Sequence, residues 1–230
     1  MTHDQIDQPI GPSLAGWRPP PYPPPSPLKG PRVRVEPLIP TSHGPGLWAC
    51  LEGAPDETWT YMAFGPFRAY EELEGTLASI ASAPAWSAYA IVVDGQPLGF
   101  AAYLRINPED GVIEIGSIVF SPALQRTTQA TEAMFLMIDN VFDLGYRRCE
   151  WKCDALNEPS RRSAIRLGFT YEGTFRQATH YKGRNRDTAW YSIIDREWPE
   201  RAPVFSRWLA EDNFDADGRQ KWSMEEMRSR

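Results

Sequence analysis

Hydrophobic and polar residues alternate in several short stretches between residues 32 and 195, and this period of two predicts β-strands. The first stretch is RVRVEPL at 32–38. The stretch SAYAIVVDGQPLGFAAYLRI, residues 87–106, predicts two strands joined at Asp94-Gly95, a dipeptide favoured in hairpin turns. The same pattern predicts four later strands, at 112–120, 146–155, 169–177 and 186–195.

Between these strands, apolar residues recur at the spacing of one helical face, which predicts helices. Residues 67–83 place four apolar side chains on one face, namely Tyr70, Leu73, Leu77 and Ile80. A long helix is predicted over about 126–144, a short one over 159–168 and a weak one over 44–53, and the first two end at glycines. Antiparallel strands followed by strand–helix–strand–helix–strand–strand indicate a mixed α/β (α+β) fold. We expect a mostly antiparallel twisted sheet with parallel pairing only where the long helix crosses over.

The two ends of the chain differ from the predicted domain at 32–200. Residues 1–31 form a proline-rich arm, and its segment GWRPPPYPPPSPLKGP is typical of polyproline II, which cannot enter a helix or a sheet interior. The arm is either a ligand for a proline-recognition domain or a strap across the protein anchored by Trp17 and Tyr22. We favour the strap, because aromatic residues on a free tail would expose apolar surface. The tail at 201–230 contains the predicted docking helix FSRWLAED.

Charge and cysteine content narrow the class of protein. The 230 residues carry a net charge of -6, which argues against a nucleic-acid binder or a membrane-surface binder. No apolar run approaches the roughly 20 residues of a membrane span, and the N-terminus does not read as a signal peptide. Three cysteines are too few for a disulfide framework. We therefore expect a cytoplasmic protein.

No metal site is expected. Cys149 and Cys153 share one face of a predicted strand, but four residues in a strand separate them by about 13 Å, too far to share an ion. The stretch NFDADG at 213–218 matches the opening of a calcium loop, but the twelfth loop position is Met224 and lacks the required carboxylate.

The stretch SPALQRTTQATEAM, residues 121–134, suggests an anion site. Threonine is a mediocre helix former, yet Thr127, Thr128 and Thr131 cluster at the start of the longest predicted helix, beside Arg126. A helix start offers unpaired amides and about half a positive charge, which suit a phosphate. The threonines can also serve simply as helix caps, and the residues alone leave both interpretations open.

The order of the motifs resembles the GNAT superfamily of acyl-coenzyme A-dependent N-acetyltransferases, in its RimJ/RimL-like branch. The resemblance covers roughly residues 31–200 and includes NEPSRRSAIRLGFTYEGTFR and KGRNRDTAWYSIIDREW. It implies acetyl-CoA as co-substrate. Its pyrophosphate would lie on six residues in a row, namely Arg126, Thr127, Thr128, Gln129, Ala130 and Thr131. Gln129 and Thr131 occupy positions where the family signature has small residues, which puts cofactor affinity in question.

The resemblance also implies roles in catalysis. In EIGSIVF, residues 114–120, a bulge eased by Gly116 would turn the backbone of Ile118 and Phe120 toward the thioester and pantetheine. Asn157 would orient the cofactor and Ser160 would protonate the leaving thiolate. The local sequence equally allows both to be helix-start residues.

For the general base the candidate is Glu114, a charged residue in a strand rich in Ile and Val. The alternative is a strand residue that faces solvent.

Two groups of arginines leave alternatives open. Arg161, Arg162 and Arg166 would meet the phosphorylated adenosine end of the coenzyme or would only solvate their helix. Around the last hairpin, Arg176, Arg184 and Arg186 would form an ion network with Asp187 or would hold a substrate carboxylate. We favour the network.

The predicted function is transfer of an acetyl group from acetyl-CoA to a primary amine of a small molecule or a protein N-terminus. A catalytically silent acyl-coenzyme A-binding regulator is the alternative, motivated by Gln129 and by the absence of a tyrosine acid in the helix 159–168. In that case the proline-rich arm would be the interaction surface. A homodimer is compatible with the sequence.

Overall fold

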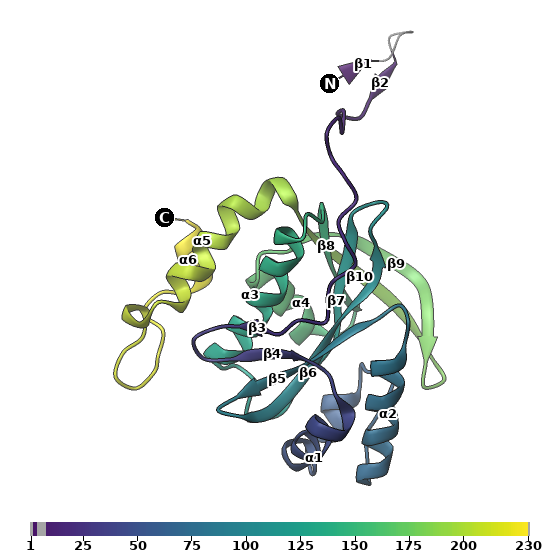
Figure 1. Ribbon diagram of the computed structural model, residues 1–230, viewed down its shortest axis with the longest axis vertical. Helices are drawn as coiled ribbons and strands as arrows, with labels where there is room; N and C mark the ends of the chain where they lie inside the picture. The colour runs from purple at the N-terminus through teal and green to yellow at the C-terminus, as the bar shows by residue number, and fades with distance from the viewer. Residues whose placement is uncertain (1, 4–7, 230) are drawn as a thin grey trace.

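The computed structural model describes residues 2–3 and 8–229. Its centre is an eight-stranded sheet with the order β3-β4-β5-β6-β7-β8-β10-β9 (Figure 1). The strands are β3 (Leu28–Lys29), β4 (Arg34–Pro37), β5 (Ser87–Val93), β6 (Gln96–Asn107), β7 (Val112–Phe120), β8 (Arg148–Asp154), β9 (Thr170–Tyr181) and β10 (Arg184–Ile194). Two short strands, β1 (Thr2–His3) and β2 (Pro9–Ile10), pair separately near the N-terminus.

All neighbouring strands of the large sheet are antiparallel except β7 and β8, which are parallel. Helix α3 (Thr128–Asp143) makes the crossover between these two strands. The predicted mixed sheet with one parallel pair is therefore confirmed. Strand β9 runs to Tyr181, four residues further than predicted, because it continues pairing with β10 up to the turn at Lys182-Gly183.

Helices cover the two faces of the sheet. Helices α3 and α4 (Glu158–Arg166) lie on one face, with α5 (Trp198–Leu209) and α6 (Met224–Arg228) outside α3 (Figure 1). Helices α1 (Pro40–Leu51) and α2 (Tyr70–Ser82) pack on the other face at the β5–β6 end. Three 3₁₀ turns complete the fold: η1 (Asp56–Trp59), η2 (Asp195–Glu197) and η3 (Glu211–Asn213). Within the described residues no helix has the length and apolarity to cross a membrane.

Helix α1 differs from the predicted weak helix at 44–53. It begins at Pro40, whose fixed φ suits the first helical turn, and so starts four residues earlier. Its interior contains Gly44, Pro45 and Gly46, three poor helix formers that weaken the sequence pattern.

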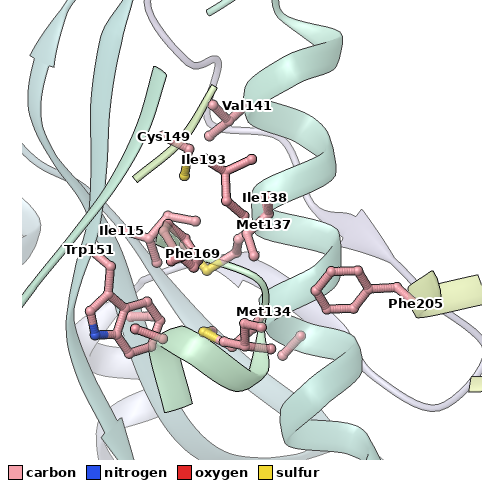
Figure 2. Packing of buried hydrophobic residues seen from close by; sticks show 14 of the residues in the cluster. Ile115, Met134, Met137, Ile138, Val141, Cys149, Trp151, Phe169, Ile193 and Phe205 are labelled. Atoms are coloured by element: carbon pink, nitrogen blue, oxygen red, sulfur yellow. The ribbon is translucent and has the colours of Figure 1, made fainter. Parts of the chain in front are cut away.

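Helix α3 is fixed by packing on two sides. Figure 2 shows its side chains Met134, Met137 and Ile138 between sheet residues such as Ile115 and the α5 residue Phe205. All five are at least 98% buried. A helix held in this way keeps its N-terminus at a fixed place beside the sheet, and that end carries the candidate site.

The proline-rich arm lies on the sheet from Trp17 onward. The buried hydroxyls of Tyr146 and Tyr89 donate hydrogen bonds of 3.1 Å to the carbonyls of Pro21 and Pro24. Pro20 and Pro23 are buried, whereas residues 9–16 are exposed and run away from the body (Figure 1). Tyr22 is 45% exposed, yet its hydroxyl donates to the Pro84 carbonyl at 3.2 Å, and the Trp17 ring lies 5.4 Å from the Arg147 guanidinium, so both aromatic residues contact the domain beside the buried prolines.

Deleting residues 9–31 is expected to lower the melting temperature by roughly 4–12 °C. The deletion removes the hydrogen bonds from the Tyr146 and Tyr89 hydroxyls, each with a net value of about 1–1.5 kcal/mol, and 1 kcal/mol corresponds to about 2–4 °C in a domain of this size. Calorimetry measures the shift. Deletion of residues 9–16 alone is the control. This variant should melt like the full chain, because the residues removed are exposed. Equal melting temperatures for the full chain and both deletion variants would contradict the prediction.

Candidate active site

Strands β7 and β8 pair over only three residues each. The parallel register joins Val112–Glu114 to Arg148–Glu150, and beyond that point β7 pairs only with β6 while β8 pairs only with β10. We call the parts of β7 and β8 that no longer pair with each other, residues 115–120 and 151–154, the strand divergence. Because the strands are parallel, the helices that follow them, α3 and α4, both begin at this end of the sheet (Figure 1).

The N-terminus of α3 offers free amides. Thr127 is the N-cap, and its side-chain oxygen accepts a hydrogen bond from the amide of Ala130 at 3.1 Å. Within the described residues the amides of Thr128 and Gln129 have no partner. Arg126 precedes the cap in a left-handed conformation with φ of 62° and is exposed. Two amides, a cation and the positive end of a sixteen-residue helix therefore meet here, an arrangement suited to a diphosphate.

Two of the predicted threonines have structural roles. The Thr127 hydroxyl donates to the Leu124 carbonyl at 2.7 Å and is used in capping. The Thr131 side chain is buried and accepts a hydrogen bond from Arg166 at 3.1 Å, so it turns into the domain rather than toward an anion. Both hydroxyls are engaged in fixing the helix end, and contact of these two residues with a pyrophosphate stays a prediction. Arg166, which also lies 4.7 Å above the Trp208 ring, is structural as well.

Strand β7 contains the predicted bulge. The pairing with β6 shifts register between Phe100 and Ala102, opposite Ser117 and Ile118, and Ser117 has φ of 51°. The left-handed residue is thus Ser117 and not Gly116. Gly116 is closely surrounded, because a Cβ there would lie 2.8 Å from the Leu104 side chain and 3.0 Å from Glu114 Oε1, and any other residue would require these side chains to shift. Beyond the bulge, Ile118 and Phe120 are half-buried along the divergence.

Glu114 lies at the point where the strands part, and it is not solvated. It is 7% exposed, and Lys152 Nζ donates a hydrogen bond of 3.0 Å to its carboxylate. The same ammonium lies 2.6 Å from Glu150 Oε2 and 3.8 Å from the centroid of the Trp190 ring. A buried lysine thus bridges two buried carboxylates, and the alternative of an outward-facing strand residue is wrong for Glu114.

The pKa of Glu114 is raised above its usual value. Burial is the main cause, and the neighbouring Glu150 carboxylate adds to it, while the charge and hydrogen bond of Lys152 oppose the rise. A carboxyl group with a raised pKa is a stronger base than an exposed one, yet it remains able to ionise beside a cation.

At the start of α4, Asn157 and Ser160 make different contacts. Asn157 is the N-cap, and its side chain accepts a hydrogen bond of 3.1 Å from the amide of Ser160. The Ser160 hydroxyl is therefore not the cap, and it accepts a hydrogen bond of 3.0 Å from Trp151 Nε1. Trp151 alternates with Lys152 along β8, so Ser160 and Glu114 lie on opposite faces of the sheet beside the divergence.

The other arginines of α4 serve the helix itself. Arg161 donates to the Tyr191 hydroxyl at 3.2 Å, and Arg161 and Arg162 both pair with Glu158 at about 3.5 Å.

The ion network expected around the last hairpin is not formed. Among the described residues neither Arg176, Arg184 nor Arg186 lies within 4.0 Å of a carboxylate. The Asp187 side chain instead accepts hydrogen bonds from the Gln177 amide and from Asn185, at 2.7 and 2.9 Å. These neutral donors satisfy Asp187, and Arg176 acts on it only through its charge. His180, on the same hairpin, is exposed.

Lys152, Glu150 and Trp190 were missed by the sequence interpretation. The signal was available, because in RCEWKCD the charged residues Arg148, Glu150 and Lys152 alternate with Cys149, Trp151 and Cys153. That alternation places the charges on one face of β8, level with Glu114 on β7.

Comparison with known protein families and solved structures identifies chains that are similar to this one. Residues 32–170 match a family model described as an acetyltransferase (GNAT) domain. Among curated proteins, none matches the chain significantly.

Solved structures are similar over most of the chain. A GCN5-related N-acetyltransferase from Brucella melitensis is 43% identical, covers 94% of this chain and 100% of its own, and has a TM-score of 0.91. A probable acetyltransferase of the GNAT family from Chromobacterium violaceum ATCC 12472 is 41% identical, with 84% and 98% covered and a TM-score of 0.80. The microcin C7 self-immunity acetyltransferase MccE, solved with acetyl-CoA and AMP, shares the fold at 19% identity, with 72% and 93% covered and a TM-score of 0.64.

Proposed function

The chain belongs to the GNAT acetyltransferase family, and on that premise we propose that it transfers an acetyl group from acetyl-coenzyme A to a primary amine. The observation that carries the proposal is the strand divergence beyond Glu114 and Glu150, with two helix N-termini at the same end of the sheet. Acetyl-CoA, as co-substrate, supplies the activated acetyl group.

In this proposal the two faces of the sheet have different tasks. Arg126 and the amides of Thr128 and Gln129 hold the pyrophosphate on the α3 face, and Asn157 fixes the start of α4 beside it. The backbone of Ile118 and Phe120, along the divergence, positions the thioester. The amine approaches from the face that carries Glu114.

The proton transfers follow from this placement. An ammonium acceptor loses two protons during acetylation, one to become nucleophilic and one as the amide forms. Glu114 accepts the first, directly or through water, and passes it to solvent. The amine nitrogen then forms the C–N bond and the C–S bond breaks. Ser160 donates its hydroxyl proton to the departing sulfur and regains one from the second proton released by nitrogen.

Two measurements test the proposed function. Coenzyme A release is followed with a panel of small amines and N-terminal peptides, and calorimetry measures acetyl-CoA binding. The resemblance to the RimJ/RimL-like branch makes peptides with free N-termini the first candidates. Acetyl-CoA binding without turnover on any amine would support the silent regulator instead.

Reversing one charge at the pyrophosphate site is the third test. Arg126→Glu is expected to weaken acetyl-CoA binding by about 1–3 kcal/mol, because it replaces a charge-assisted contact by repulsion. Arg219→Glu, which makes the same charge change at a side chain 80% exposed, is the matched control. Calorimetric titration measures both variants, and an unchanged affinity in Arg126→Glu would remove this residue from the site.

A further inference from the structure

Arg186 lies on β10 next to the end of β8. Its guanidinium is 5.9 Å from the centroid of the Tyr181 ring, and the Tyr181 hydroxyl donates to Asp154 Oδ2 at 2.8 Å. Asp154 is the last residue of β8 and pairs with Thr188. Arg186 therefore lies at the open end of the strand divergence.

Among the described residues, the Arg186 side chain contacts the face of the Tyr181 ring but has neither a counter-charge nor a hydrogen-bond acceptor. Its Nε atom is buried without a hydrogen bond, and within residues 2–3 and 8–229 its guanidinium makes no ion pair and no hydrogen bond. A cation that is partly withdrawn from water without a counter-charge is unfavourable. Such an arrangement is expected where a ligand supplies the missing acceptor.

Two carboxylates of this region, Asp154 and Asp187, are satisfied by neutral donors. Asp154 accepts from the Tyr181 hydroxyl and from the Leu156 amide, at 2.8 and 2.9 Å. Asp187 accepts from the Gln177 amide, in a left-handed backbone position with φ of 49°, and from Asn185. The fold thus satisfies both acids with neutral donors and leaves the cation free.

A second unpaired donor lies on the same strand. Trp190 Nε1 is buried without a partner, and the Trp190 ring contacts Lys152, which bonds Glu114. Arg186 is four residues from Trp190, in phase with it along the strand. The indole and the guanidinium can donate hydrogen bonds but cannot accept them. Within the described residues neither of these two donors is met by an acceptor of the protein, and an anionic ligand would bring one.

Building on the proposed function, we infer that Arg186 binds an anionic group of the amine acceptor. Arg186 and Trp190 are four positions apart on the strand, about 13 Å between Cα atoms. In the proposed function the reacting nitrogen lies beside Glu114, whose partner Lys152 contacts the Trp190 ring. The anionic group and that nitrogen are then on the order of 10 Å apart, which an extended chain of three residues spans. The acceptor class is an elongated amine, such as a short peptide, with a carboxylate or phosphate at that distance.

The β9–β10 hairpin that carries Arg186 is fixed in place. Lys182 at its tip donates to the carbonyls of Trp59 and Phe64, at 2.8 and 3.2 Å, and Tyr61 donates to the Leu156 carbonyl at 3.1 Å. The segment between α1 and α2 thus contacts both the hairpin tip and the loop after β8. Arg186 is held ready for its ligand rather than carried on a free loop.

The test uses di-, tri- and tetraglycine, each as the free acid, the C-terminal amide and the C-terminal phosphonate analogue. With the full-length protein, kcat/KM for triglycine acid should exceed that for its amide by roughly 10–100-fold, the size of a charged hydrogen bond. Arg186→Gln should remove this preference, mainly through KM, while leaving the amide unchanged. Arg184→Gln, an exposed arginine on the same hairpin, is the matched control and should behave like the wild type.

The outcomes separate this inference from the proposed function. If kcat/KM for the amide equals or exceeds kcat/KM for the acid, the inference is overturned and the acetyltransferase proposal stays intact. Weaker acetyl-CoA binding in Arg186→Gln, with equal loss for all amines, also overturns it. If no amine is acetylated, the proposed function fails, and calorimetry of triglycine acid against its amide, with coenzyme A present, still decides whether Arg186 binds the anion. The phosphonate series distinguishes a phosphate from a carboxylate ligand.

Discussion

Ser160→Ala is expected to lower kcat by roughly 10²–10⁴-fold while acetyl-CoA affinity stays within about twofold of the wild type. The proposed reason is loss of the proton that goes to the departing thiolate, a step that contributes to kcat and not to binding. Because thiolate is a fair leaving group unaided, the lower part of this range is the expected one. Stopped-flow release of coenzyme A under saturating substrates measures the effect.

A structural loss must be distinguished from a chemical one in this variant. The helix cap is Asn157, so alanine at position 160 removes no cap, but it leaves the buried Trp151 indole without its acceptor. An unpaired buried donor costs about 1–3 kcal/mol of folding stability. Adding Trp151→Phe removes the orphaned donor, and the double variant should regain stability without regaining turnover.

Ser163→Ala is the matched control on the same helix. The Ser163 hydroxyl donates to the Pro159 carbonyl at 2.8 Å and is exposed, so its removal should leave both kcat and stability nearly unchanged. Wild-type turnover in Ser160→Ala would show that this hydroxyl has only a structural role, as acceptor for Trp151 and partner of the Cys153 side chain.

The sequence predicts the elements of this fold because local patterns determine them. The period of two in VIEIGSIVF and RRCEWKC, with a helical stretch between, predicts β7, α3 and β8 and their parallel order. The same strands illustrate what local patterns leave out. Pairing stops at Glu114 and Glu150, and nothing in either stretch marks that point, because the end of pairing depends on the register of two strands that are separated by 35 residues of intervening chain.

Side-chain roles were harder to predict than backbone elements. Thr131 was expected at an anion site or as a helix cap, and its hydroxyl meets Arg166, a residue 35 positions away. Asp187 is next to Arg186 in sequence, but it bonds the Gln177 amide, because a bulge in β9 brings that amide to it. In each case the partner is distant in sequence or set by irregular backbone, and no periodic pattern reports it.

The second large effect is expected for Lys152→Met, which should lower the free energy of unfolding by about 3–5 kcal/mol, because two buried carboxylates lose their shared cation. Denaturant unfolding at neutral pH measures the loss. Arg105→Gln is the control: Arg105 is 66% exposed and 3.9 Å from Glu114, and its replacement should cost less than about 1 kcal/mol. Adding Glu114→Gln to Lys152→Met removes one of the two repelling charges and should restore part of the stability.

The same Lys152→Met variant tests Glu114 as the base through its pH dependence. Lys152 lowers the pKa of Glu114, so without it burial and the Glu150 carboxylate raise that pKa further. A base acts only when deprotonated, and the acidic limb of kcat/KM against pH should therefore move to higher pH. Activity lost at neutral pH should partly return in alkaline buffer, where Glu114 is ionised again. Glu114→Gln lacks this limb altogether, and its activity should rise with pH only as the amine itself becomes neutral. If the acidic limb stays in place in Lys152→Met, the titrating group is not Glu114, and the carboxylate serves only to hold β7 and β8 together.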